Sequence, residues 1–467
     1  MIGLALWLLQ AAPVGDVGRP GVAYRIEARL DETTHVLHAR GTLAYRNASP
    51  DTLGELVVHL YLNAFRPHSL WARTERRPQY AFGALAEPDY AFERLGRVAV
   101  RGVEVRPEYP YAPDSTVARL PLPRPLPPGD SVVVELEWTA RLSTLWRRQG
   151  RAGRHYDWAH GYPRIAVYDR YGWQGHPLYP QGEFYGEFAT YDVTLDLAAD
   201  QVVAATGVPV EGDPGWERAA VAGSPVTHLR DAYGRRAAER EAAAEPPPGR
   251  KRVRFRAERV HHFAWSCDPA FRYEEGRYGD VVLRVLYRPE SAPAWSGRVL
   301  AYAARALAFL DSVFGPYPWP QLTIAERLEG GGTEFPMLVM NGGASESLVV
   351  HEVAHQYVHG ALANNEWREG WLDEGFATFL ARRYLDARYG PVRAPPGRGL
   401  ARHRIPLAAR AQDALRVLWL DAFGWSQPVS WPSEDYTEFL IYNRMIYTKG
   451  SLVLESLAGL LGEETFA

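Results

Sequence analysis

Two histidines four residues apart constrain the fold of this chain more than any other feature. His351 and His355 have neither Gly nor Pro between them, so a helix places both rings on one face about one turn apart. That spacing suits two ligands of one metal ion, and imidazole is a common zinc ligand. In such a His-Glu-x-x-His arrangement, Glu352 lies beside the metal, where it can accept a proton from a bound water. Glu352 is therefore the candidate general base.

The third ligand should be one further side chain, because a catalytic zinc keeps its fourth position open for water. Glu374 is the candidate. Eighteen residues, 356 to 373, separate it from His355, which is enough to end one helix, turn and begin a second helix. A chance match to the short motif is the alternative, and the spaced Glu374 argues against it. We expect one Zn²⁺ per chain.

His359 lies four residues beyond His355 and invites assignment as a further ligand. Along a helix, His351 and His359 would be about 12 Å apart. Both would need to lie about 2.1 Å from one zinc ion. A polar role next to the ligands is therefore the better interpretation of His359.

The segment Trp371–Ala377 reads WLDEGFA and contains Glu374. With this segment the chain resembles the aminopeptidase N family of gluzincin zinc metallopeptidases, whose signature is His-Glu-x-x-His followed after eighteen residues by a Glu inside W-L-x-E-G-F-A. The resemblance implies a bacterial-type zinc aminopeptidase that hydrolyses the N-terminal residue of peptides. Its partners would be peptide substrates with a free N-terminus.

A glycine-rich segment precedes the zinc motif, and glycines allow a substrate backbone to approach a strand edge closely. A plain turn is the alternative. The family's exopeptidases carry G-x-M-E-N here, and the Glu of that motif binds the substrate's α-amine. Gly331, Gly332 and Glu334 fall on this pattern, whereas Thr333 and Phe335 depart from it. The resemblance thus implies Glu334 as the amine anchor.

Two tyrosines follow the zinc motif. Tyr447 stands in a Tyr-x-Lys-Gly segment whose Tyr, in the family, donates a hydrogen bond to the oxyanion formed during hydrolysis. A phenol suits this role because it stays neutral near pH 7 and donates one directed hydrogen bond. Tyr442 matches an aromatic residue found near the site in some relatives and is interpreted as pocket lining.

Many relatives supply a further acidic or amide side chain for the substrate amine from the first domain. The Arg-x-x-x-Pro-x-x-Asp segment of those relatives is not found in this chain. Gln181 and Glu183, just before a predicted strand, are the nearest candidates for the amine contact.

Composition limits the class of protein. The chain has 467 residues, which suits two or three domains, and its net charge of −3 gives no indication of a nucleic-acid partner. Its single cysteine excludes an internal disulfide framework. The apolar run from Ile2 to Leu9 is too short for a stable membrane span but has the texture of a signal-peptide core.

We therefore expect export, to the periplasm, the medium or a membrane surface. The absence of Lys and Arg before Arg19 favours the cytoplasmic alternative. The sequence leaves the oligomeric state open.

The predicted fold class is α+β and multidomain. Alternating apolar and polar positions from Tyr24 onward predict an antiparallel, β-sandwich-like domain over residues 19–274, after a candidate signal peptide at 1–18. Residues 275–450 should form a thermolysin-like α/β peptidase domain. Residues 451–467 would begin a C-terminal helical region that is truncated relative to the family.

Two other functions stay open. The zinc machinery does not itself select a free amine, so an endopeptidase or another amide or epoxide hydrolase is one rival. A non-catalytic peptide-binding scaffold is the other.

Overall fold

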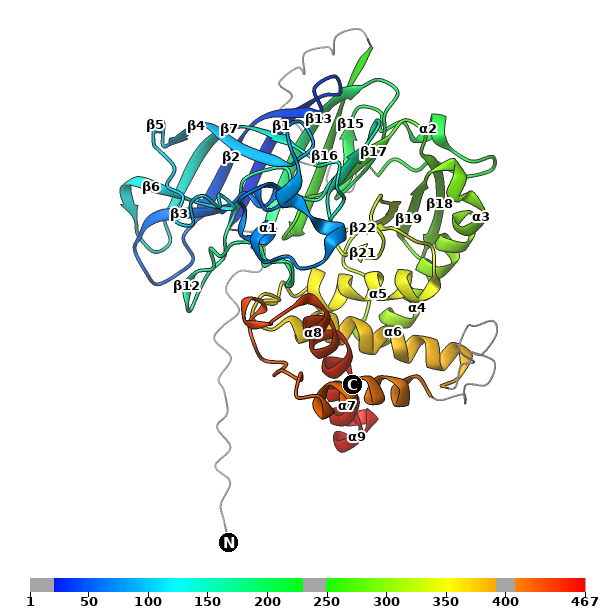
Figure 1. Cartoon of the computed structure of the whole chain (residues 1–467). Helices are drawn as coiled ribbons and strands as arrows, with labels where there is room; N and C mark the ends of the chain where they lie inside the picture. The colour runs from blue at the N-terminus through cyan, green and yellow to red at the C-terminus, as the bar shows by residue number, and fades with distance from the viewer. Residues whose placement is uncertain (1–20, 230–248, 392–407, 467) are drawn as a thin grey trace.

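The structure is a computed structural model that describes residues 21–229, 249–391 and 408–466. A β-rich first part lies beside a second part with its own sheet, and helices α5 to α9 lie together at the other end of the molecule (Figure 1). The candidate signal peptide at 1–18 lies outside the described residues.

The largest sheet has eight strands, and its alternating sequences explain its two faces. Strand β1 alternates between buried and more exposed positions along its whole length, which is the pattern of a sheet with one face on the core. In spatial order the strands are β15 (Val208–Glu211), β16 (Arg250–Val260), β13 (Ala189–Ala198), β1 (Val22–Asp31), β2 (Val36–Arg46), β7 (Ser131–Arg141), β4 (Phe92–Val100) and β5 (Val103–Glu104).

One strand pair departs from the predicted antiparallel pattern, because β1 and β13 run parallel. More than one hundred residues separate the two strands, which leaves room for the crossover that a parallel pair needs. The other pairs of this sheet are antiparallel.

Smaller sheets and short helices complete the first part of the chain. They are β10 (Arg164–Ile165), β3 (Leu53–His59) and β6 (Val117–Leu126) in one sheet, β14 (Val202–Ala205), β17 (Trp265–Asp268), β9 (His155–Trp158) and β8 (Gly150–Ala152) in another, the pair β11 (Tyr168–Asp169) and β12 (Gly172–Trp173), and helices α1 (Leu70–Thr74) and α2 (Trp216–Ala219).

A buried histidine lies beside a contact between the first and second parts of the chain. His155 lies between Asp157 and Asp268, with nitrogen–oxygen distances of 2.9 and 3.0 Å, and Asp157 also accepts a hydrogen bond from the backbone N–H of Leu328. Burial lowers the pKa of His155, but the charges of the two carboxylates and their hydrogen bonds outweigh burial and raise the pKa to about 9. The imidazolium is therefore the stable form at neutral pH.

The second part is built on a five-stranded sheet. Its order is β18 (Arg272–Tyr278), β19 (Val281–Tyr287), β20 (Gln321–Glu326), β22 (Leu338–Asn341) and β21 (Gly332–Thr333). Strands β19, β20 and β22 run parallel, and β20 and β22 are buried throughout, as expected for parallel strands. The short edge strand β21 pairs antiparallel with β22.

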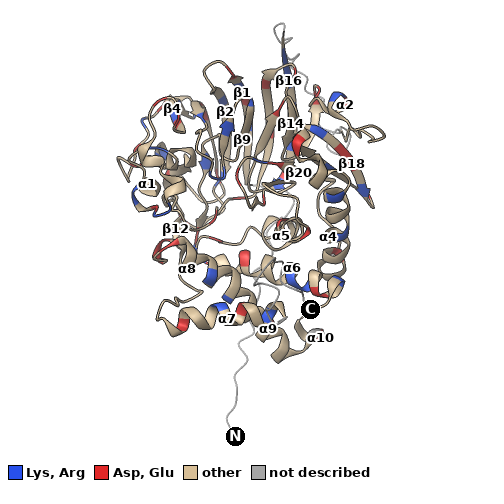
Figure 2. Cartoon of the chain, turned by 45° about the vertical axis from the view of Figure 1, so that its right-hand side comes forward, with Lys and Arg blue, Asp and Glu red and all other residues tan. Residues whose placement is uncertain are grey.

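The second part also contains helices. They are α3 (Ala292–Trp295), α4 (Arg298–Phe314), α5 (Glu346–His355), α6 (Glu374–Tyr389), α7 (Ala409–Ala422), α8 (Phe439–Asn443), α9 (Gly450–Leu461) and α10 (Glu463–Phe466). Helix α4 buries Val299, Ala303, Ala306, Leu307 and Leu310 at helical spacing, and Gly315 caps its C-terminal end. Acidic and basic residues are interspersed along strands and helices (Figure 2).

This arrangement confirms the predicted fold class, a β-rich N-terminal part followed by a mixed part with a sheet and helices. The domain limits stay predictions, and strand β18 runs across the one placed after residue 274. Among the described residues, no helix has the length and apolarity needed to cross a membrane.

Candidate active site

Three side chains meet where α5 and α6 pack against each other. They are His351, His355 and Glu374, and together they form the triad. His351 Nε2 lies 3.0 Å from Glu374 Oε2, His355 Nε2 lies 3.2 Å from the same oxygen, and the two imidazole nitrogens are 3.2 Å apart. Ligand atoms about 2.0–2.1 Å from a tetrahedral ion are separated by about 3.3 Å, so the three atoms fit the corners of a zinc site. Two imidazoles and one carboxylate are also a donor set that suits zinc.

Local sequence explains how each helix presents its ligand. Helix α5 begins after Ser345, whose hydroxyl accepts a hydrogen bond from the backbone N–H of Leu348 and so caps the helix. Its last turn carries His355, and the chain then continues into a π-helical turn, Gln356–Gly360. Helix α6 begins at Glu374, so the predicted helix, turn and helix are all present.

Two motif glycines bring α6 close to α9. A Cβ built on Gly375 would lie 3.3 Å from the Cα of Gly450 and 3.2 Å from the carbonyl oxygen of Ile446. A side chain at either glycine would separate the two helices. This close approach places Tyr447, three residues before Gly450, over the triad.

Asp373 orients one of the histidines. Its Oδ1 lies 2.5 Å from His355 Nδ1 and can accept a hydrogen bond from an N–H at that nitrogen. The lone pair of the imidazole is then on Nε2, which faces His351 and Glu374. Burial lowers the pKa of His355, but the charges of Asp373 and Glu374 outweigh it and the pKa is raised. Burial raises the pKa of Glu374, but the two imidazoles outweigh it and the pKa is lowered, so Glu374 is a carboxylate.

Glu352, the candidate base, is buried beside the glycine-rich segment. A Cβ on Gly332 would lie 2.2 Å from both Cδ and Oε1 of Glu352, so the carboxyl group occupies the space that a side chain at Gly332 would need. Burial raises the pKa of Glu352, although His351 and His355 oppose the shift. A raised pKa suits a group that accepts and returns a proton near neutral pH.

Arg327 holds the glycine-rich segment in place. Its guanidinium donates to the carbonyl oxygens of Glu329 and Gly330, at 3.1 and 2.7 Å, and to the hydroxyl of Thr333. Gly331 has a φ of +77°, a conformation that favours glycine. Thr333, one of the departures from the family pattern, therefore fixes the strand edge rather than facing away from it.

Three buried carboxylates converge beside the metal-type triad. One oxygen each from Glu183, Glu334 and Glu374 lies within 4.8 Å of the others. Burial and the charge of Glu183 raise the pKa of Glu334 well above its usual range. Arg148 pairs with Glu183, with nitrogen–oxygen distances of 2.5 and 2.7 Å, and so offsets one of the negative charges.

Gln181 is placed differently from Glu183. Its side-chain amide donates to the carbonyl oxygen of Tyr436 at 3.0 Å and so connects the first part of the chain with the C-terminal helices. Its proposed contact with a substrate amine stays a prediction.

Both tyrosines lie at the site. The Tyr447 hydroxyl donates to Glu374 Oε1, and its ring is nearly parallel to that of His351, with centroids 6.0 Å apart and an interplanar angle of 12°. Tyr442 is buried, and its hydroxyl oxygen would lie 3.0 Å from a Cβ on Gly370. That hydroxyl has no hydrogen-bond partner within the described residues.

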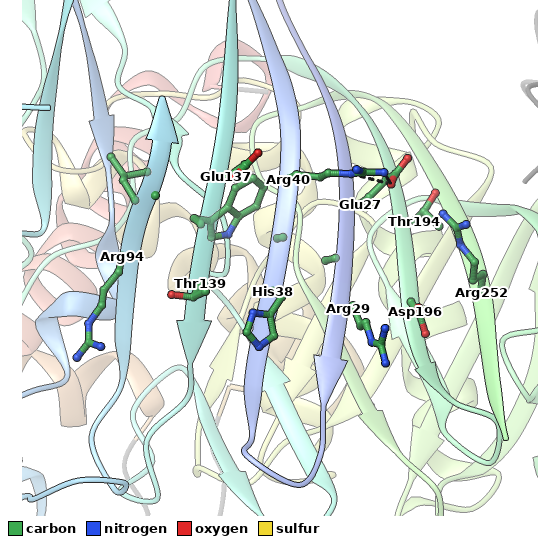
Figure 3. Close-up of a pocket in the computed structure, with 15 residues that line it drawn as sticks. Glu27, Arg29, His38, Arg40, Arg94, Glu137, Thr139, Thr194, Asp196 and Arg252 are labelled. Carbon is green, nitrogen blue, oxygen red and sulfur yellow. Dashed lines mark hydrogen bonds and ion pairs between the residues drawn. The ribbon is translucent and has the colours of Figure 1, made fainter. Parts of the chain in front are cut away.

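A separate hollow of about 650 Å³ lies on the outer face of the eight-stranded sheet (Figure 3). Arg29, His38, Arg94, Asp196 and Arg252 are among its lining residues, and none of the predicted site residues is. Its lining mixes positive and negative side chains without a cluster of chemically reactive groups. The candidate active site is therefore identified by the positions of its donor atoms and not by this hollow.

Sequence reasoning did not single out Arg148, Arg327 or Asp373. Asp373 could have been found as the variable position of the W-L-x-E motif, and Arg327 as the charge between a predicted strand and the glycine-rich segment. Arg148 carries no local signal, because its partner Glu183 lies 35 residues away.

The arrangement of donors, two histidines of one helix and a glutamate of the next, resembles that of a class of metallopeptidases. Residues 340–467 match the family described as "Peptidase family M1 domain". The crystal structure of an M1 zinc metallopeptidase from Deinococcus radiodurans has the same fold, with a TM-score of 0.59 at 17% identity over 96% of this chain and 84% of that one.

Curated relatives point the same way. Aminopeptidase B of Rattus norvegicus is 28% identical over 172 residues, which are 34% of this chain and 25% of that protein. Aminopeptidase N of Homo sapiens is 30% identical over 124 residues, 26% of this chain and 12% of that protein. The matches thus span a quarter or less of these two relatives. Together the comparisons support the predicted assignment, an aminopeptidase N-like member of the gluzincins.

Proposed function

We propose that this protein is a zinc-dependent aminopeptidase that hydrolyses the N-terminal residue of peptides and holds one zinc ion per chain. The observation that carries the proposal is the cluster of Glu183, Glu334 and Glu374 next to two histidines. A metal site needs only one of these carboxylates, and Arg148 pairs with Glu183, so Glu334 is left to bind a cation. The α-ammonium group of a peptide is such a cation.

His351, His355 and Glu374 would hold the zinc ion. When bound, zinc supplies a lowered pKa to a coordinated water and polarises the scissile carbonyl. Asp373 keeps the imidazole of His355 in the orientation that this requires.

Glu352 acts as the general base and then as the general acid. It accepts a proton from the attacking water and returns it to the leaving amine. Its burial against Gly332 fixes the direction in which its carboxyl group points. Tyr447 donates its hydroxyl hydrogen to the oxyanion, for which it must exchange its bond to Glu374.

Glu334 anchors the substrate's ammonium group, and Glu183 assists it. Arg148 holds the Glu183 side chain, so Glu334 is the carboxyl group left for the ammonium, whose positive charge favours the ionised form of Glu334. An oxygen of Glu334 lies within 4.8 Å of an oxygen of the zinc ligand Glu374, so an ammonium bound by Glu334 places the first peptide bond next to the zinc site. Gly331 and Gly332 leave room for the substrate backbone, and Tyr442 lines the pocket.

Similar proteins agree with this reaction class. One of the solved neighbours is described as an M1 zinc metallopeptidase mutant from Deinococcus radiodurans bound to a Tyr-Ser-Ala substrate. That description applies to the neighbour, and its extension to this chain is part of the proposal.

The test is hydrolysis of aminoacyl amide reporters beside N-acetylated copies of the same reporters. We expect the wild type to cleave only the free-amine set, and a chelator or Glu352→Gln to abolish cleavage. Glu334→Gln should lower kcat/KM for free-amine reporters. Cleavage of acetylated copies would favour the endopeptidase alternative, and a zinc-loaded protein without turnover would favour the scaffold alternative.

We also propose that the protein is exported. N-terminal sequencing of the mature protein from separated cell fractions tests this, and an intact Met1 in the cytoplasmic fraction would contradict it.

A further inference from the structure

A second group of buried polar side chains lies directly behind the triad. His359, Glu366 and Asp373 each place one nitrogen or oxygen within 4.8 Å of the others, and all three are at most 2% exposed. Asp373 also contacts His355, so this group reaches the proposed zinc site through one side chain. Neither the metal ligands nor the proposed catalytic groups include Glu366 or His359.

A neighbouring histidine cluster is less suited to a second metal. His261, His262 and His359 lie close together, but a neutral imidazole has only one lone pair to offer. Nη1 of Arg164 lies 2.5 Å from His262 Nδ1 and 3.0 Å from His262 Nε2. A guanidinium can only donate, so the one lone pair of the neutral imidazole accepts from Arg164 and is not available to a cation.

The carboxyl group of Glu366, in contrast to the imidazole of His262, is not taken up by hydrogen bonds among the described residues. Both of its carboxyl oxygens are buried without a hydrogen-bond partner in the described structure, and so is Oδ2 of Asp373. Its Oε1 lies 3.3 Å from His359 Nε2. A buried polar group of this kind needs a partner or a role, because leaving it unpaired costs about 1–3 kcal/mol.

The raised pKa of Glu366 favours a role as hydrogen-bond donor. Burial, and then the negative charge of Asp373, raise its pKa well above the usual range, which favours the protonated form. Two groups that can accept this proton lie close by, a carboxyl oxygen of Asp373 within 4.8 Å and Nε2 of His359 at 3.3 Å.

We propose that Glu366 is a positioning residue of the metal site, which holds Asp373 from behind and thereby fixes the imidazole of His355. The inference rests on the proposed zinc site. Asp373 has one oxygen on His355 and one oxygen free, so it can rotate about its side-chain bond unless the free oxygen is held. His359 Nε2 contacts the same carboxyl group, 3.3 Å from Glu366 Oε1. Groups that orient a metal-ligating histidine contribute about tenfold to hundredfold in metal affinity.

The test compares two substitutions at this position in the full chain. Glu366→Met fills a similar volume but cannot hold Asp373, and Glu366→Gln keeps a hydrogen-bond donor. Zinc affinity is measured by competition with a chromophoric chelator, and the visible spectrum of the cobalt-substituted protein reports the ligand geometry. We expect the zinc Kd of Glu366→Met to rise about tenfold to hundredfold, with an altered cobalt spectrum, and Glu366→Gln to remain close to wild type.

Glu93 supplies the matched control. It is also buried, its carboxyl oxygens accept no hydrogen bond from a side chain of the described ranges, and burial likewise raises its pKa well above the usual range. Glu93→Met should change thermal stability without changing zinc affinity. If Glu366→Met does not fold, Glu366→Leu takes its place with the same expectation.

Several results would overturn the inference. One is a zinc Kd and a cobalt spectrum of Glu366→Met that equal those of the wild type. Another is an equal rise of the zinc Kd in Glu366→Gln and Glu366→Met. A third is a second metal ion per chain that the Glu366 variants lose. A wild type that binds no zinc would overturn the proposed function and this inference with it. A wild type that binds zinc and cleaves peptides, with an unaffected Glu366→Met, would overturn the inference alone.

Discussion

Gly332→Ala should displace the carboxyl group of the general base, Glu352, without replacing the residue. The new methyl group would lie 2.2 Å from Cδ and Oε1 of Glu352 and 2.5 Å from its Cγ. Carbon atoms in contact are normally about 3.5–4.0 Å apart, so the carboxyl group must retreat by at least about 1 Å. The clash falls on a flexible side chain, and the fold can therefore absorb it.

The expected loss follows from this displacement. A misplacement of about 1 Å at a reacting group costs about a hundredfold in rate, which corresponds to about 2.7 kcal/mol in activation free energy. We expect kcat to fall by about that factor for a free-amine reporter. Zinc affinity and Tm should stay close to the wild-type values, because neither the ligands nor the backbone need to move.

Gly330→Ala is the control, since a Cβ at Gly330 meets nothing within 4 Å and its φ is not in the left-handed region. Steady-state kinetics, zinc content and Tm are measured for both variants and for Glu352→Gln. A Gly332→Ala enzyme with wild-type kcat, beside an inactive Glu352→Gln, would refute the reasoning that this glycine holds the base in place.

Three further outcomes are expected. Tyr447→Phe should lower kcat about a hundredfold or more with little change in KM, because the only substrate group that the hydroxyl contacts is the oxyanion, which forms during the reaction. Gly375→Val should lower Tm and kcat together, since a larger side chain separates α6 from α9 at Gly450. The His155 contact should stabilise the fold by about 3 kcal/mol below pH 6.5, and this stabilisation should be lost as the pH rises through about 9. Urea unfolding of wild type and His155→Gln across this range measures the difference.

Each of these outcomes can fail in a distinct way. A raised KM with unchanged kcat in Tyr447→Phe would assign the phenol to substrate binding. An unchanged Tm in Gly375→Val would mean that the helices do not need their close approach. A wild-type stability that does not fall between pH 6.5 and 9 more steeply than that of His155→Gln would contradict the raised pKa of His155.

Much of the site could be predicted because its spacing is local. One helical turn separates His351 from His355, and the structure places both rings with Glu374 at mutual distances of 3.0–3.2 Å. Strand alternation likewise predicted the large sheet, because a side-chain period of two is read directly from residues such as those of β1. The parallel pairing of β1 with β13 was not predictable, since no local pattern specifies which distant strand becomes the neighbour.

The sequence by itself determined the donor set, its order on two helices and the class of chemistry that it permits. Only the tertiary structure decided which polar side chains pair with other protein groups and which are left to bind a ligand. Arg148 takes up Glu183, and the Gln181 amide is used by Tyr436, which lies 255 residues later in the chain. The physical reason is that helix and strand periodicities act over a few residues, whereas the partner of a buried charge is set by packing between distant segments, where an unpaired group is costly.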